Sequence, residues 1–332
     1  MTLLKPGFPK EDKLFPSTKC LTKYDRSVTG GHGALGHECG LAMLEHGIEY
    51  LGIIDLKSDA TKLETLSKRG GRVSRVQEFI IDLSQDDSAE KALEFFCKTF
   101  PRLDIVLCCA GIVGAEHALE TTALKWRRMQ DINTTSAFLI AQASAKRMIE
   151  FATKREEPRL WCGASIILIS SIPAHHVNFP QPQVAYNVSK AGISHMARCL
   201  AAEWAVHGIR VNSISPGYMN TALNVGEHLD QAKKVWYART PMGRMGRPDE
   251  IAGVVVMLSS PAGSYITGSD IVVDGKLELD GNCYNDTDSS KEDSRLYENI
   301  RSTLACSSAA NIPSRCYARD QPKAIIEHRI LP

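Results

Sequence analysis

Tyr186 and Lys190 stand four residues apart in the helical pattern YNVSK, so their side chains are expected on one helix face. A tyrosine with its ordinary pKa of about 10 is a poor acid–base catalyst at neutral pH, but a neighbouring ammonium lowers that pKa. Tyr186 could then exchange a proton with a carbonyl or alcohol oxygen. Ser171 follows the apolar run SIILIS and could hold the same oxygen. A lone Tyr-x-x-x-Lys pair is more often a pair of surface neighbours, so other motifs must support this one.

A glycine-rich segment, TGGHGALG at residues 29–36, leads directly into a helical pattern. The N–H groups of such a turn, together with the positive end of the helix dipole, can bind a pyrophosphate. We expect Gly30, Leu35 and Gly36 to contact a dinucleotide there. A glycine loop without any ligand is the alternative.

Two acidic residues follow the next apolar runs. Asp55 ends the run LGII, where it could accept hydrogen bonds from an adenosine ribose diol and repel a 2′-phosphate. That favours NAD(H), although Lys57 lies close by and NADP(H) is not excluded. Asp82, after FII, is placed to bond an adenine amino group. Either residue could instead be an ordinary turn or helix-capping residue.

The elements that must position these residues alternate regularly from residue 28 to about 275. Such alternation predicts βαβ units with a parallel sheet covered on both faces. We expect an α/β, Rossmann-type doubly wound domain over residues 28–276, an irregular extension at 1–27, and a disordered or loosely docked tail at 277–332. The expected strands are 50–54, 78–81, 105–109, 165–169, 209–214 and 271–273, and the expected helices are 38–46, 89–99, 124–152, 185–207 and 249–258.

Composition excludes several classes of function. The 39 basic and 38 acidic residues leave a net charge of +1 with no basic stripe, so neither nucleic acid nor a membrane surface is an expected partner. The ten cysteines show no paired zinc-ligand spacing. We therefore expect no metal and a cytoplasmic protein with reduced thiols.

Together these motifs closely resemble the short-chain dehydrogenase/reductase family over residues 28–275. The resemblance implies a catalytic tetrad in which Asn133 holds a proton-relay water, Ser171 orients the substrate, Tyr186 is the acid/base and Lys190 tunes it and holds the nicotinamide ribose. It also implies that Pro216-Gly217 and Thr221 lie beside the nicotinamide carboxamide, under a mobile lid at 218–244. Alone, Asn133 would be interpreted as a buried helix asparagine.

Within the family, NFPQPQVAYNVSKAG and AAEWAVHGIRVNSISPGYMNTAL resemble the fungal sorbose reductase, mannitol and arabinitol dehydrogenase branch. This implies an NAD(P)-dependent oxidoreductase, a homodimer or homotetramer, acting on a ketose or polyol or on a small molecule of secondary-metabolite biosynthesis. The residues expected to line the pocket are His175, His176, Asn178, Gln183 and Tyr218, although the histidines could equally lie in an exposed loop.

Four departures from the family pattern support an alternative. Ala34 replaces a loop glycine, Cys108-Cys109 replaces two asparagines, and Lys276 replaces a glycine before the tail. The opening strand carries Asp25 and Arg26 where a covered sheet requires apolar residues, and burying either without a partner is costly. Displaced exon boundaries would explain the oddities at the two ends. The alternative function is a catalytically impaired binding or scaffold protein.

Overall fold

The computed structural model describes residues 21, 25–70, 74–100, 102–153, 163–178, 181–221, 224 and 229–276. Most of the extension at 1–27 and the whole tail at 277–332 lie outside these residues, so the expectations for both ends remain predictions. The side chains of residues 25–29 and 231 are likewise outside the description.

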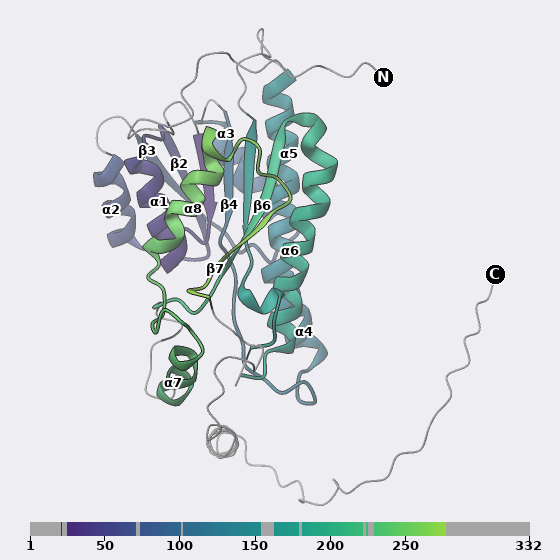
Figure 1. The fold of residues 1–332 in the computed structure, drawn as a ribbon. Helices are drawn as coiled ribbons and strands as arrows, with labels where there is room; N and C mark the ends of the chain where they lie inside the picture. The colour runs from purple at the N-terminus through teal and green to yellow at the C-terminus, as the bar shows by residue number, and fades with distance from the viewer. Residues whose placement is uncertain are drawn as a thin grey trace, which may run out of the picture. The chain divides into compact units, whose positions relative to one another are not determined.

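The core of the fold is a seven-stranded parallel sheet with the strand order β3-β2-β1-β4-β5-β6-β7 (Figure 1). Because the order reverses between β1 and β4, the sheet is doubly wound and has a switch point at the carboxyl ends of these strands, where such folds bind ligands. The expected fold class is confirmed. The strands are β1 (Asp25–Thr29), β2 (Tyr50–Asp55), β3 (Arg75–Ile80), β4 (Ile105–Cys108), β5 (Ala164–Ile169), β6 (Ile209–Pro216) and β7 (Asp270–Val273).

Helices cover both faces of this sheet. Alternate residues of β5 point to opposite sides, so Ile166 and Leu168 join one buried cluster while Ile167 and Ile169 join the other. Strands buried on both faces explain the nearly continuous apolar runs in the sequence. The helices are α1 (Ala34–Glu45), α2 (Ala60–Gly70), α3 (Ser88–Cys97), α4 (Ala123–Gln130), α5 (Ser136–Thr153), α6 (Val184–Trp204), α7 (Asp230–Ala238) and α8 (Asp249–Ser259).

The first strand forms despite its polar residues. β1 pairs with both β2 and β4. In this register Asp25 lies opposite Tyr50, the first residue of β2, and Arg26 lies opposite Ile105, the first residue of β4. Asp25 and Arg26 therefore begin the strand at the amino edge of the sheet and do not lie in its middle. The strand needed to deliver the glycine loop is present.

Three features differ from the expected elements. Helices α2 and α7 were not among the predicted helices, and α2 buries only Leu66, which explains its weak apolar pattern. The long helix expected at 124–152 is interrupted by the π-helical turn η1 (Asp131–Thr135), which contains Asn133.

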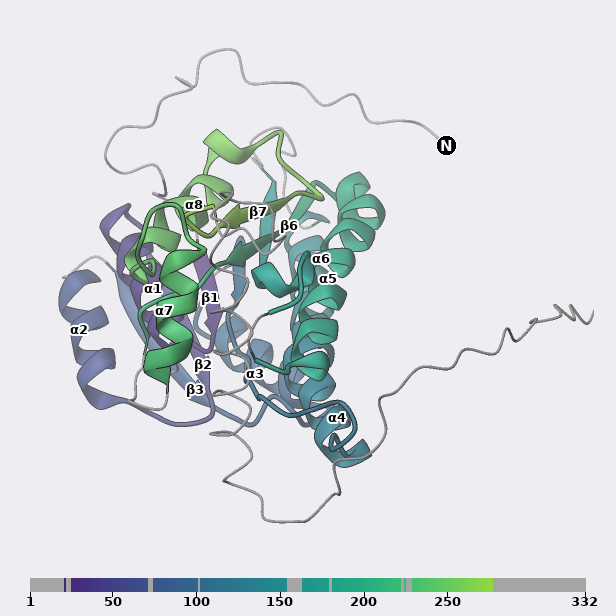
Figure 2. The same ribbon diagram turned by 60° about the horizontal axis from the view of Figure 1, so that its bottom comes forward.

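Figure 2 brings forward the edge of the molecule where α7 lies. Among the described residues, no helix is long and apolar enough to cross a membrane.

Candidate active site

The glycine loop joins β1 to α1 in a turn that only glycine can form. Gly30 has φ +64°, and a Cβ there would lie 2.8 Å from the Ala110 backbone N. A Cβ on Gly36 would lie 2.3 Å from the Gly30 carbonyl oxygen. The loop thus packs closely between α1 and the end of β4, and the expected contacts of Gly30 and Gly36 with a dinucleotide remain predictions.

The amino end of α1 is open to an anion. Gly33 is its N-cap, and within the described chain no side chain caps it and no acidic residue occupies its first turn. Its first N–H groups and the helix dipole therefore suit a pyrophosphate. Leu35 lies half-buried in the same first turn. These features fit the diphosphate of a dinucleotide.

Asp55 lies at the carboxyl end of β2, beside this loop. Its Oδ2 accepts the backbone N–H of His32 at 2.9 Å, and its Oδ1 accepts that of Leu56 at 2.7 Å. Asp82 follows β3 and accepts the Ser84 N–H at 2.9 Å, and that bond, with the charge of Arg128, lowers the pKa of Asp82. Both carboxylates stand at the same edge of the sheet as the loop.

The three residues expected to act on the substrate are brought together by β5 and α6. The Ser171 hydroxyl lies close enough to the Tyr186 phenol to act on its pKa. Lys190 is 5% exposed, and its Nζ lies 5.8 Å from the centre of the Tyr186 ring. Nζ donates to the Ile169 carbonyl at 2.9 Å, the one acceptor that the described residues offer it. The remaining ammonium hydrogens suit hydroxyl groups of a bound ribose.

Burial dominates the electrostatics of this group. It raises the pKa of Tyr186, and the Ser171 hydroxyl offsets part of that rise. It also lowers the pKa of Lys190 to about 8, with Cys109 opposing the change. The lowering of the Tyr186 pKa by Lys190 that the sequence predicted is not seen in the structure, where desolvation of the phenolate is the largest effect on that pKa.

Asn133 sits in the π-helical turn η1, and both ends of its side-chain amide are hydrogen-bonded. Its Oδ1 accepts the Ile112 N–H at 2.8 Å, while its Nδ2 donates to the Ile112 carbonyl at 3.0 Å and to Ser189 Oγ at 2.9 Å. These bonds match the structural interpretation of a buried asparagine with a backbone partner. They fix the chain just after Gly111, whose would-be Cβ lies 3.5 Å from Lys190 Nζ.

The segment after β6 forms one wall of the site. Gly217 donates its N–H to Val273 O at 2.9 Å, and a Cβ on it would lie 2.7 Å from the Asp274 Cα. Thr221 is half-buried in the following turn and donates its N–H to Met219 O. Tyr218 stacks on Trp236 of α7 with ring centres 4.1 Å apart. The stack holds α7 against the site, a contact for which the sequence offered no signal.

The residues expected to line the substrate pocket lie in three places. The Tyr218 hydroxyl lies 3.4 Å from both Asn178 Oδ1 and Gln181 Oε1, and Asn178 Nδ2 donates to Gln183 Oε1 at 2.5 Å. These side chains form one polar rim, in which Gln181 was not predicted. His176, in contrast, is exposed.

His175 belongs to a separate network around Asp270, the first residue of β7. The carboxylate is 4% exposed and lies 2.5 Å from His175 Nε2. It also accepts from serine hydroxyls of α6 and β6, namely Ser194, Ser213 and Ser215. The network thus ties the turn after Ser171 to α6, β6 and β7. The residues of this network are distant in sequence, so no local sequence pattern predicted it.

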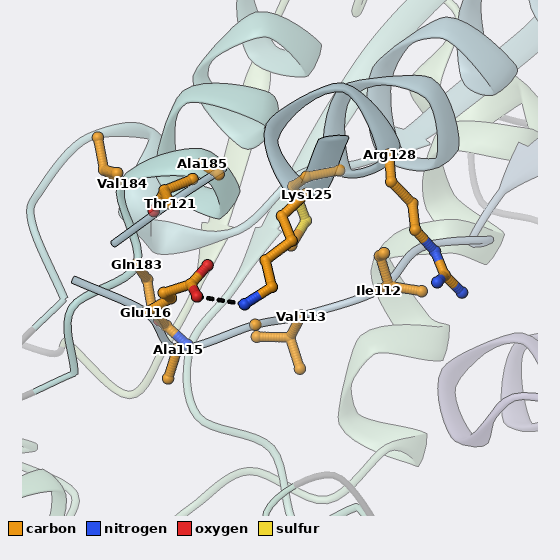
Figure 3. A pocket seen from close by; sticks show the side chains of 12 residues that line it. Ile112, Val113, Ala115, Glu116, Thr121, Lys125, Arg128, Gln183, Val184 and Ala185 are labelled. Carbon is orange, nitrogen blue, oxygen red and sulfur yellow. Dashed lines mark hydrogen bonds and ion pairs between the residues drawn. The ribbon is translucent and has the colours of Figure 1, made fainter. Parts of the chain in front are cut away.

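A cavity of about 460 Å³ lies between α4, the 112–116 segment and the start of α6 (Figure 3). Lys125 and Glu116 form an ion pair across it. Gln183 and Ala185 contribute to its wall just before Tyr186, whereas Ser171, Tyr186 and Lys190 do not line it. It is therefore a side pocket, next to the catalytic group. Among the described residues, no group of three or more metal-ligating side chains gathers.

Comparison with known proteins identifies the family. Residues 32–276 match the family model described as enoyl-(acyl carrier protein) reductase. The chain is 31% identical to the NADP-dependent mannitol dehydrogenase of Alternaria alternata over 252 residues, which are 75% of this chain and 90% of that protein. It is 33% identical to the NADH-dependent L-xylulose reductase of Ambrosiozyma monospora over 260 residues, covering 75% and 92%. The crystal structure of a short-chain type dehydrogenase/reductase from Mycobacterium marinum superposes with a TM-score of 0.72 at 33% identity, covering 79% of this chain and 98% of that one.

The chain belongs to the short-chain dehydrogenase/reductase family. It is an NAD(P)-dependent oxidoreductase acting on CH–OH groups of small molecules, as the sequence predicted. The resemblance to the fungal polyol branch is also confirmed. The alternative of an impaired scaffold protein gains no support, since β1 takes its place in the sheet.

Proposed function

We propose that this enzyme interconverts a polyol-like secondary alcohol and its ketone, with NAD(H) as the preferred cofactor and Tyr186 as the acid/base. The observation that carries the proposal is the meeting of Ser171, Tyr186 and the buried Lys190 ammonium beside the glycine loop. A proton donor, an oxygen-orienting hydroxyl and a cation with spare hydrogens are the groups that carbonyl reduction requires.

Each of these side chains has a defined part. The nicotinamide ring, when bound, supplies or accepts the hydride. Ser171 holds the reacting oxygen through its hydroxyl, and Tyr186 gives that oxygen a proton in reduction or removes one in oxidation. Lys190 binds the ribose through the ammonium hydrogens that the Ile169 carbonyl leaves available. Asn133 fixes Gly111 and Ile112 through its side chain, so the relay water assigned to it by resemblance would have to bind outside that amide.

The preference for NAD(H) rests on Asp55. Its carboxylate, aligned by the His32 and Leu56 N–H groups, is suited to accept hydrogen bonds from a free ribose diol and to repel a 2′-phosphate. Asp82 would accept from the adenine amino group, and Gly217 and Thr221 would contact the carboxamide. Relatives of both cofactor types exist, so the charge of Asp55 is the main argument.

The substrate class is proposed from the polar rim. The carboxamides of Asn178, Gln181 and Gln183, with the Tyr218 hydroxyl, offer several donors and acceptors within reach of one another. Such a rim suits a substrate with several hydroxyl groups, since hydroxyl groups can exchange hydrogen bonds with these side chains and an apolar ketone cannot. The names of the relatives, mannitol dehydrogenase and L-xylulose reductase, agree with this choice.

We also infer a homodimer or homotetramer. Exposed apolar side chains lie along α4 and α6, among them Leu124, Trp126, Val184 and Val188. A second copy would cover such residues. Cytoplasmic location stays a prediction from the cysteine pattern.

Two measurements test the proposed function on the purified full chain. Fluorescence titration should show NADH binding, and a panel of ketoses, polyols and bulky cyclic ketones should show turnover confined to the polyhydroxylated compounds. Turnover of the cyclic ketones alone would overturn the substrate class. Failure of both NADH and NADPH to bind at millimolar concentration would overturn the function itself.

A further inference from the structure

A second carboxylate lies near Asp55 and takes no part in the function described so far. Glu78, on β3, reaches toward the glycine loop and is 22% exposed. Its Oε2 lies 2.8 Å from His32 Nε2, and its Oε1 accepts the Ser58 hydroxyl at 2.8 Å. Because the His32 N–H donates to Asp55 while its ring contacts Glu78, one loop residue holds both carboxylates.

Two basic groups of this corner, Lys62 and His32, are already engaged. The Lys62 Nζ donates to His32 O at 2.5 Å and lies 3.7 Å from Asp59 Oδ2. The His32 side chain is 5% exposed and is directed to Glu78. Burial and the charge of Lys62 lower the pKa of His37, which favours its neutral form. Lys57 is exposed and is the remaining cation beside Asp55.

We propose that Glu78 is a second determinant of cofactor choice, which, together with Asp55, repels a nucleotide that carries a phosphate on its 2′-hydroxyl. The inference rests on the proposed preference for NAD(H) and extends it to β3. The contact between His32 and Glu78 matters for this choice, because a histidine in this loop could otherwise have paired with a phosphate. The His32 Nε2 is engaged by Glu78 and the His32 side chain is 5% exposed, so that nitrogen is not available to the phosphate.

The effect of Glu78 should be long-range and selective. A carboxylate and a phosphate several ångströms apart near a protein surface repel measurably, and salt screens that repulsion. A dinucleotide without the 2′-phosphate lacks the charge that Glu78 would act on. Glu78 should therefore weaken NADPH binding and leave NADH binding nearly unchanged, whereas Asp55 also bonds the ribose and affects both.

A consequence follows for attempts to change the cofactor. Asp55→Ser removes one carboxylate but leaves Glu78 with its two partners, so that variant should accept NADPH only in part. The double variant Asp55→Ser/Glu78→Gln should bind NADPH more tightly than Asp55→Ser alone. Glutamine keeps an acceptor for Ser58 and a polar contact with His32, so the loop should stay in place.

The test is a set of fluorescence titrations of the full chain with NADH and with NADPH, without substrate. Glu78→Gln should lower the Kd for NADPH by about tenfold while the Kd for NADH changes by less than about twofold. Added salt should reduce the NADPH-to-NADH ratio of Kd values more in the wild type than in Glu78→Gln. Glu64→Gln, which removes an exposed charge from α2, is the matched control and should change neither Kd.

Three outcomes would overturn the inference. One is an unchanged NADPH affinity in Glu78→Gln, and another is an equal shift for both dinucleotides, which would indicate a structural role of the His32–Glu78 pair. The third is a wild type that binds NADPH as tightly as NADH, because the preference itself would then be wrong. A wild type that binds neither dinucleotide would instead refute the proposed function, which separates the two failures.

Discussion

The proposed site has two parts in which charged side chains are held differently, a catalytic half around Tyr186 and Lys190 and an adenosine half around Asp55 and Glu78. In the catalytic half, Lys190 and Asp270 are almost fully buried. Lys190 donates to a main-chain carbonyl, and Asp270 accepts from serine hydroxyls and contacts His175. In the adenosine half, Asp55 and Glu78 are only partly buried and accept from N–H groups and one histidine ring. Buried charge is costly to fold, whereas partly exposed charge is not. Substitutions in the catalytic half should therefore change rate and stability, and those in the adenosine half mainly the choice of cofactor.

The largest expected effect belongs to the catalytic half. Tyr186→Phe removes the proton that reaches the substrate oxygen, and turnover should fall by about a thousandfold. The Kd for NADH should stay within about threefold, because the ring and the Lys190 ammonium remain. Steady-state kinetics and a fluorescence titration check the two parts. Tyr265→Phe is the control, since Tyr265 is 97% exposed. Substantial turnover by Tyr186→Phe would mean that another group moves the proton.

The next effect concerns the stability cost of Lys190. Its pKa is lowered from 10.5 to about 8 in the folded chain, so between these pH values the unfolded chain holds more protons and stability rises with pH. Below about pH 8 the folded chain bears the full free-energy cost of burying the charged Lys190 ammonium. Lys190→Met should therefore raise the free energy of unfolding at pH 7 by about 3 kcal/mol, less the lost bond to Ile169 O. The gain should disappear near pH 10.5.

Urea unfolding at both pH values measures this gain, with Lys91→Met, an exposed lysine of α3, as the control. The same variant should lose NADH affinity and turnover. A Lys190→Met chain that is less stable at pH 7, or equally changed at both pH values, would show that burial of the ammonium carries no such cost.

The next prediction tests the close packing of Gly36 in the glycine loop, at the junction of the two halves. A Cβ on Gly36 would meet Gly30 O, so Gly36→Ala must displace the loop and should cost about 2 kcal/mol of stability. NADH affinity should fall with it. Gly253→Ala in α8 meets nothing within 4 Å and should instead stabilise the helix by about 0.5–1 kcal/mol. Thermal unfolding with and without NADH measures both, and equal behaviour of the two variants would contradict the packing argument.

The smallest effect should come from the adenosine half. Asp55→Ser removes acceptors for the ribose diol and should raise the Kd for NADH by about tenfold while improving that for NADPH. Folding stability should change little. Titration with both dinucleotides is the measurement, and Asp86→Ser is the control, because Asp86 is exposed after β3. An unchanged ratio of the two Kd values would refute the role assigned to Asp55.

Local patterns in the sequence were sufficient for much of the fold and the site. Apolar runs located β2 to β7, and the spacing of Ser171, Tyr186 and Lys190 predicted that these side chains meet, because a strand end and one helix face fix their positions. The sequence did not predict helix α2, because this helix buries a single leucine and its apolar pattern is weak. The π-helical turn at Asn133 leaves no compositional mark. The pairs His32–Glu78 and His175–Asp270 join residues from separate elements, which only the packed sheet brings together.

The Asp270 network has a consequence for the order of assembly. Ser194, Ser213, Ser215 and His175 all leave the ribosome before the carboxylate that accepts from them. Chains often begin to fold during synthesis, so the turn after Ser171 should be fixed only when β7 docks at the edge of the sheet. We expect active-site formation to be one of the last events in the folding of this domain. A chain interrupted before residue 270 should then be inactive even though every proposed catalytic side chain has been made.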